Sequence, residues 1–110
     1  MEVFILKTNY KIAIVGSTGV VGRTVLKVLE EKSFKNCTYT LFASKKSAGT
    51  KVQFMGQNYI IQELTEDSFK SNFDYAIFCA GGAVSKEFIP IAVQTGCIVI
   101  DNSSVYRMDK

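Results

Sequence analysis

A glycine-rich turn between an apolar run and an amphipathic segment constrains the fold of this chain more than any other feature. Residues 12–15 read Ile-Ala-Ile-Val, and residues 16–22 read Gly-Ser-Thr-Gly-Val-Val-Gly. The apolar residues that follow recur at helical spacing as far as about Lys32; they are Val21, Val25, Val28 and Leu29. The apolar run indicates a strand buried on both faces, and the spacing indicates a helix with one buried face. A turn in this context is typical of dinucleotide-binding sites.

Each glycine of the turn has a physical reason in this interpretation. Gly16 permits the sharp turn, and Gly19 lets backbone N–H groups approach a pyrophosphate at the positive end of the helix. Gly22 allows the helix to pack closely on the strand. We predict that the whole turn binds the cofactor: Gly16, Ser17, Thr18, Gly19, Val20, Val21 and Gly22. The alternative is a glycine turn that holds no ligand.

Further strands and helices alternate along the chain. Residues 39–43 predict a second strand, and residues 75–79 predict a buried strand. Residues 84–92 predict a second amphipathic helix, which stops at Gly96, and residues 97–100 predict the last strand. Strands joined through helices should run parallel to one another.

The middle of the chain follows a different pattern. Residues 51–62 predict a small hairpin around the Gly-Gln-Asn sequence at residues 56–58. Residues 65–71 predict a short helix with Thr65 as its N-cap. Pro90, in the second half of the chain, predicts either the start of a regular helix or a kink in it.

These elements predict an α/β fold: a Rossmann-like, doubly wound, mostly parallel sheet with a small β-hairpin insertion. The length of 110 residues is that of one domain. We assign residues 11–110 to a dinucleotide-binding domain and residues 1–10 to an N-terminal extension or added strand.

The residues after the second strand favour one cofactor over another. An NAD-binding unit usually places an acidic residue there, which accepts a hydrogen bond from the ribose 2′-hydroxyl. This chain has Ser44, Lys45, Lys46 and Ser47 instead, and the whole stretch from residue 32 to 62 contains five lysines and no acid. Cations and hydroxyls suit a 2′-phosphate, so we predict NADP, bound by Ser44, Lys46 and Ser47. The alternative is an exposed loop with incidental lysines.

Two other segments follow predicted strands and should lie at the same edge of the sheet. Ala80 and Gly81 are small enough to let the backbone of a cofactor pass, although a plain strand-to-helix turn is an equal alternative. Arg107 follows the last strand, and its planar fork can clamp an anion. Taken by itself, such a residue is more often a surface arginine.

Composition excludes several classes of function. The chain has no histidine, which removes Ser-His and Cys-His dyads and histidine-ligated metal sites, and we predict no metal. A net charge of +3 is too mild for duplex DNA, and no nucleic-acid partner is expected. The apolar run at residues 3–6 is too short for a secretory signal or a membrane helix. Three cysteines without pairing motifs predict buried, reduced thiols and a cytoplasmic location: Cys37, Cys79 and Cys97.

Four ordered motifs, between about Lys11 and the end of the chain, resemble aspartate-semialdehyde dehydrogenase; they are residues 16–22, 43–49, 85–88 and 101–109. The resemblance implies conversion of β-aspartyl phosphate to aspartate semialdehyde with NADPH, on the route to lysine, threonine and methionine. It implies that residues 18–21 hold the cofactor phosphates, and that Ser44, Lys46 and Ser47 hold the 2′-phosphate, although Lys46 is usually arginine. It implies that Arg107 binds the phosphate of the substrate or inorganic phosphate, and that the full-length enzyme is a homodimer.

The resemblance also implies a nucleophilic cysteine after an asparagine, a catalytic histidine and a dimer-forming domain, and this chain has none of them. Cys37 follows Asn36, but it precedes the second strand rather than lying at an active-site turn. We therefore expect no catalytic residue in this chain, which should be the N-terminal cofactor domain and inactive alone. The alternatives are the same portion of N-acetyl-γ-glutamyl-phosphate reductase, or a non-catalytic NADP-binding module.

Overall fold

A parallel five-stranded sheet, in the order β5-β2-β1-β6-β7, forms the centre of the molecule. The computed structural model describes residues 9–32 and 37–102. The strands of the sheet are β1 (Tyr10–Val15), β2 (Cys37–Ala43), β5 (Gln62–Glu63), β6 (Tyr75–Phe78) and β7 (Ile98–Asp101). The chain leaves β1 toward β2 on one side and later returns to β6 on the other, which is the strand order of a doubly wound fold.

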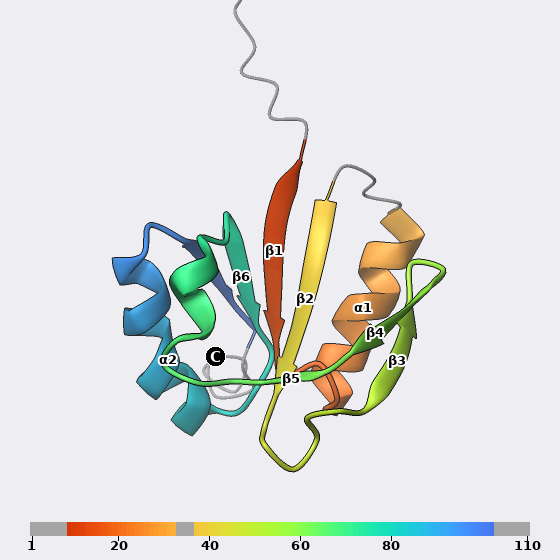
Figure 1. Cartoon of the computed structure of the whole chain (residues 1–110), viewed down its shortest axis with the longest axis horizontal. Coiled ribbons are helices and arrows are strands. Elements are labelled where there is room, and N and C mark those ends of the chain that lie inside the picture. The colour runs from red at the N-terminus through yellow and green to blue at the C-terminus, as the bar shows by residue number, and fades with distance from the viewer. Residues whose placement is uncertain (1–8, 33–36, 103–110) are drawn as a thin grey trace, which may run out of the picture.

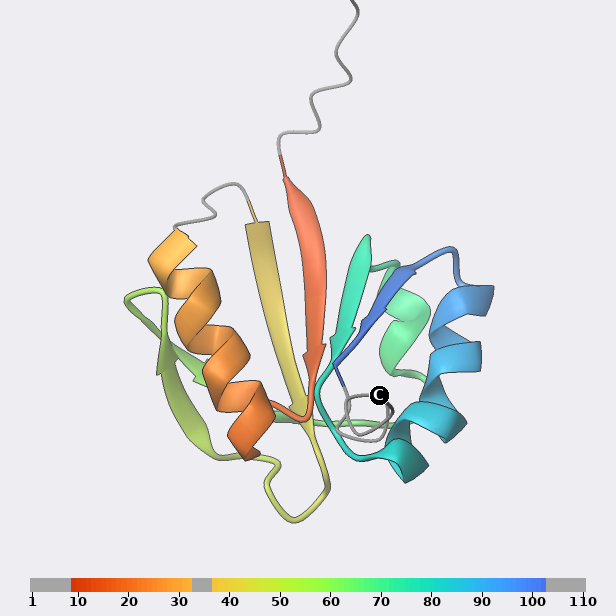
Figure 2. The same cartoon turned by 180° about the vertical axis from the view of Figure 1, so that it is seen from behind.

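The helices cover both faces of this sheet, as Figures 1 and 2 show. Helix α1 (Val20–Lys32) lies on one face, together with the antiparallel hairpin of β3 (Lys51–Phe54) and β4 (Gln57–Ile60). Helix α2 (Gly82–Gln94) and the 3₁₀ turn η1 (Ser68–Ser71) lie on the other. The predicted α/β class, the mostly parallel sheet and the small hairpin are all confirmed.

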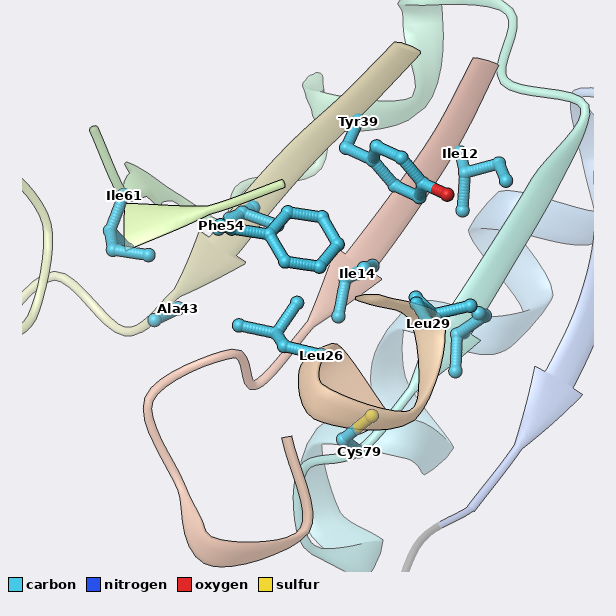
Figure 3. Packing of buried hydrophobic residues seen from close by; sticks show 11 residues of the cluster. Ile12, Ile14, Leu26, Leu29, Tyr39, Ala43, Phe54, Ile61 and Cys79 are labelled. Atoms are coloured by element: carbon cyan, nitrogen blue, oxygen red, sulfur yellow. The ribbon is translucent and has the colours of Figure 1, made fainter. Parts of the chain in front are cut away.

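Strand β1 is buried on both faces because its side chains alternate between two hydrophobic clusters. Ile12 and Ile14 belong to the cluster beneath α1 and the hairpin (Figure 3). Ala13 and Val15 belong to the cluster beneath α2 and η1, which is rich in phenylalanine. An uninterrupted apolar run is what such a central parallel strand requires.

The buried stripe of α1 differs by one position from the predicted one. Leu26 and Leu29 are buried, whereas the predicted Val28 is 43% exposed. Helical geometry places residues three and four apart on one face, so Leu26 and Leu29 face the sheet together and Val28 turns away from it. Helix α2 begins at Gly82 and runs through Pro90, which is exposed, so the prediction that Pro90 starts the helix is wrong. The prediction that the helix stops at Gly96 is confirmed.

The segment between the two halves of the fold also departs from the prediction in detail. The hairpin turns at Met55 and Gly56, whose φ angles of 55° and 74° are those of a tight two-residue hairpin loop. Strand β5 pairs with β2 and was not predicted, because two residues are too short to show a pattern. Thr65 does not cap a helix: η1 begins later, with Asp67 at its N-cap position.

Strand β1 already begins at Tyr10, inside the segment predicted as an extension, and residues 1–8 lie outside the described residues. The division at residue 10 stays a prediction. In the part of the chain that the structure describes, no helix combines the length and the apolar character that crossing a membrane requires.

Candidate functional site

A cavity of about 440 Å³ opens where the carboxyl ends of β1, β2 and β6 meet. This is the point at which the strand order reverses, and open α/β sheets bind ligands there. In Figure 1 the connections that leave these strands lie together at the lower end of the sheet. The residues that line the cavity are Val15, Gly16, Thr18, Gly19, Ala43, Ser44, Leu64, Cys79, Ala80, Gly81, Val84 and Phe88.

The glycine turn is held against the end of β2 by its first two residues. The N–H groups of Gly16 and Ser17 donate to the carbonyl of Phe42 at 2.8 and 3.2 Å. The buried hydroxyl of Ser17 donates to the carbonyl of Ile14 at 2.8 Å, and it lies 3.3 Å from that of Phe42. Ser17 therefore holds the turn in place, and the prediction that it contacts a cofactor stays a prediction.

The glycines of the turn have different surroundings. A Cβ atom on Gly16, whose φ is +86°, would lie 2.7 Å from the backbone nitrogen of Ala80. A Cβ atom on Gly22 would lie 2.0 Å from the carbonyl oxygen of Gly16. At Gly19, by contrast, the nearest atom would be 3.8 Å away. Gly16 and Gly22 are thus required by packing, whereas Gly19 leaves open space where the first-turn N–H groups of α1 lack partners within the helix.

The loop after β2 is a compact turn fixed by its own backbone. Both Ser47 and Ala48 donate to the carbonyl of Ser44 at 3.0 Å, and Gly49 donates to the carbonyl of Ile61 at 2.8 Å. Ser44 and Lys46 are exposed and Ser47 is half-buried. No described carboxylate forms an ion pair with Lys46, and its side chain is exposed to solvent.

The structure places some of the predicted cofactor-binding residues in the cavity lining and others outside it. Gly16, Thr18, Gly19, Ser44, Ala80 and Gly81 line the cavity, and Ser47 is bonded to Thr18 at its border. Val20 is 74% exposed and Val21 is half-buried beside the core, and neither residue lines the cavity. Gly22 is buried beneath the turn.

Sequence reasoning missed the apolar wall of the cavity. Leu64 follows β5, Cys79 follows β6, and Val84 and Phe88 lie one helical turn apart on α2. The periodicity of Val84 and Phe88 had indicated a core stripe, and both are half-buried beside the second cluster. Their spacing alone could not show that the stripe continues into a cavity at its N-terminal end.

The segment that leads to Arg107 leaves β7 at the same edge of the sheet. The N–H of Asn102 donates to the carbonyl of Phe78 at 2.7 Å. The buried hydroxyl of Ser85, in the first turn of α2, donates to the Asp101 carboxylate at 3.5 Å. Arg107 itself lies outside the described residues.

Cys79 and Cys97 have the character of structural thiols rather than nucleophiles. Cys79 and Cys97 are buried and free, as predicted, whereas Cys37 is partly exposed. Burial raises the pKa of Cys79 to about 12, and the nearby Asp101 charge adds to the effect. Burial also raises the pKa of Cys97 to about 11. A nucleophilic thiol needs the opposite shift. Within residues 9–32 and 37–102, no group of acidic, cysteine or histidine side chains could hold a metal ion.

The raised pKa of Cys79 predicts a loss of stability in alkaline solution. Its pKa rises from the ordinary thiol value of 9.0, which holds for the unfolded chain, to about 12 in the folded one. The folded state therefore holds more protons in that interval, and the free energy of unfolding falls as the pH rises above 9. In urea unfolding, the free energy of unfolding should fall less between pH 8 and pH 10.5 for Cys79→Ala than for the wild type. Equal falls in the two proteins would show that the Cys79 thiol is not responsible for the loss of stability.

Comparison with known proteins gives one consistent family. Residues 11–110 match the family described as semialdehyde dehydrogenase, NAD binding domain. The chain is 50% identical to aspartate-semialdehyde dehydrogenase of Bacillus subtilis, over 90% of this chain and 28% of the relative. It is also 50% identical to that of Campylobacter jejuni, over 96% of this chain and 31% of the relative. The chain thus spans about a third or less of these relatives.

A solved structure shows the same fold. The crystal structure of aspartate semialdehyde dehydrogenase II from Vibrio cholerae, complexed with ASA, superposes with a TM-score of 0.81 and 40% identity. The match covers 92% of this chain and 33% of that one. The aspartate semialdehyde dehydrogenase of Candida albicans, at 23% identity and a TM-score of 0.71, shares the fold.

Proposed function

Because the chain belongs to the semialdehyde dehydrogenase family, whose NAD-binding domain it matches, we propose that it is the NADP-binding part of an aspartate-semialdehyde dehydrogenase. The whole enzyme would convert β-aspartyl phosphate to aspartate semialdehyde and phosphate, in the biosynthesis of lysine, threonine and methionine. The observation that carries the proposal is that three segments line one cavity. They are the glycine turn, the loop after β2 and the Ala80–Gly81 turn.

The residues at this edge suit a dinucleotide. The open space at Gly19 and the first turn of α1 would take the pyrophosphate, which favours the positive end of a helix. Ser44, Lys46 and Ser47 would hold the 2′-phosphate, and Ala80 and Gly81 would border the path of the cofactor. The bound cofactor would supply the hydride, while these residues bind and orient it.

Arg107 is proposed as the ligand of the substrate phosphate. The segment that carries it departs from β7 beside β6, because Asn102 is bonded to Phe78. A guanidinium fork there could grip a phosphate with two parallel hydrogen bonds. For the whole enzyme, the proposal also includes a nucleophilic cysteine, a catalytic histidine, a homodimeric assembly and a cytoplasmic location.

We expect the chain to bind NADP more tightly than NAD. In calorimetric titrations Lys46→Ala should lower NADP affinity by about tenfold, since a hydrogen bond to a charged group contributes about 1.5 kcal/mol or more. NAD lacks the 2′-phosphate, so its affinity should change far less. Lys27→Ala, an exposed lysine on α1, serves as the matched control and should leave both affinities unchanged. Equal or tighter binding of NAD by the wild type would contradict the cofactor assignment.

A second expected result concerns activity. The purified chain should form no NADPH from NADP, phosphate and aspartate semialdehyde. It has no histidine, and its buried thiols resist ionisation. Turnover that required phosphate and was abolished by Cys37→Ser would show that catalysis resides in this chain after all.

A further inference from the structure

One hydrogen bond joins a side chain of the glycine turn to a side chain of the loop after β2. The hydroxyl of Thr18 donates to the hydroxyl oxygen of Ser47, with 3.4 Å between the two oxygens. The two residues are 29 positions apart in the sequence, and the contact is partly buried. It connects the segment proposed for the pyrophosphate with the segment proposed for the 2′-phosphate.

Each partner stands on backbone that is held independently of the other. The turn before Thr18 is bonded to β2 through Gly16 and Ser17. Ser47 donates its N–H to the carbonyl of Ser44 at 3.0 Å, and its carbonyl accepts from Thr50 at 3.2 Å. The hydroxyl pair therefore sets the orientation of two side chains rather than the position of the loops.

The direction of the bond determines what Ser47 can offer to a ligand. Ser47 accepts from Thr18, so its own O–H remains available to donate to another acceptor. The accepted bond also restricts rotation of the Ser47 hydroxyl, which lowers the entropy that a ligand must remove on binding. The neighbouring Lys46 is exposed and reaches an anion through a long, flexible side chain.

We infer that Thr18 is a positioning residue for cofactor specificity: its hydroxyl orients Ser47 so that Ser47 donates to the 2′-phosphate of NADP. The inference rests on the proposed function. Thr18 acts through Ser47 here, whereas a direct contact of Thr18 with the pyrophosphate would strengthen NAD and NADP binding alike. The ratio of the two affinities separates these roles.

The test is calorimetric titration of the 110-residue chain with NADP and with NAD, for the wild type and five variants. Ser47→Ala should reduce the NADP-to-NAD affinity ratio by about tenfold. Thr18→Val should reduce it by about fivefold, and the double variant should fall no further than Ser47→Ala alone. Thr18→Ser keeps the hydroxyl and should keep the ratio near its wild-type value.

The fifth variant, Thr24→Val, is the matched control. Thr24 donates to the carbonyl of Val20 within α1, is exposed and lies outside the cavity lining. The NADP-to-NAD affinity ratio of the Thr24→Val variant should therefore equal that of the wild type. Parallel losses of NAD and NADP affinity in Thr18→Val, or additive losses in the double variant, would overturn the inference while leaving the proposed function intact. A wild type without preference for NADP would overturn both.

Discussion

Gly22→Ala is expected to destabilise the fold by about 3 kcal/mol, because the added methyl group has no room. Its Cβ would lie 2.0 Å from the carbonyl oxygen of Gly16 and 2.9 Å from the Cα of Ser17. Alanine favours a helix over glycine by only about 1 kcal/mol, which is smaller than the cost of moving this backbone. A loss of about 3 kcal/mol is a large part of the stability of a small domain. Chemical denaturation followed by circular dichroism measures it.

Gly19→Ala is the matched control for this experiment. The nearest atom to its Cβ would be 3.8 Å away, an ordinary contact, so the free energy of unfolding should change by less than about 0.5 kcal/mol. The new methyl group would instead enter the space proposed for the pyrophosphate, and binding of NADP and NAD should weaken together. Equal stability of the Gly22 variant and the wild type would show that α1 can move away from the turn at little cost.

Phe54→Ala is expected to lower the free energy of unfolding by about 3–5 kcal/mol. Phe54 belongs to the hairpin, yet its side chain is fully buried in the cluster beneath α1. Its ring packs edge-on against Tyr39, with 4.9 Å between the centroids, and Figure 3 shows it near Leu26. Removing the ring leaves a cavity between the hairpin and the sheet. Urea denaturation at neutral pH gives the measurement.

Val28→Ala tests whether this cost comes from burial. Val28 is also apolar, but it is 43% exposed on the outer side of α1, so its loss should change the free energy of unfolding by less than about 0.5 kcal/mol. A similar small effect for Phe54→Ala would mean that the hairpin does not contribute to the core.

The strands and helices that carry the site were predictable because their signals are local. Residues 12–15 are apolar without interruption, which a strand covered on both faces requires. A glycine turn between such a strand and an amphipathic helix is typical of dinucleotide-binding sites. The roles of Gly16 and Gly22 could also be argued beforehand, since only glycine fits a sharp turn and a close helix contact.

Features that depend on a distant partner could not be predicted. Strand β5 is recognisable only by its pairing with β2, and Phe54 is buried only because the hairpin folds onto α1. The structure also gave Ser17 a backbone-anchoring role that its place in the motif did not reveal. A two-residue strand and a single serine carry too little pattern to show which part of the chain they meet.

The amino-acid sequence by itself determined the α/β class, the strand–turn–helix unit and the kind of ligand, because periodicity, glycine placement and charge act over a few neighbouring residues. Only the tertiary structure decided which residues share the cavity. Parallel strands bring segments together that are tens of residues apart, so the apolar wall at Leu64 and Phe88 and the bond from Thr18 to Ser47 arise from sheet order. Such contacts are set by how the strands align, which no local pattern encodes.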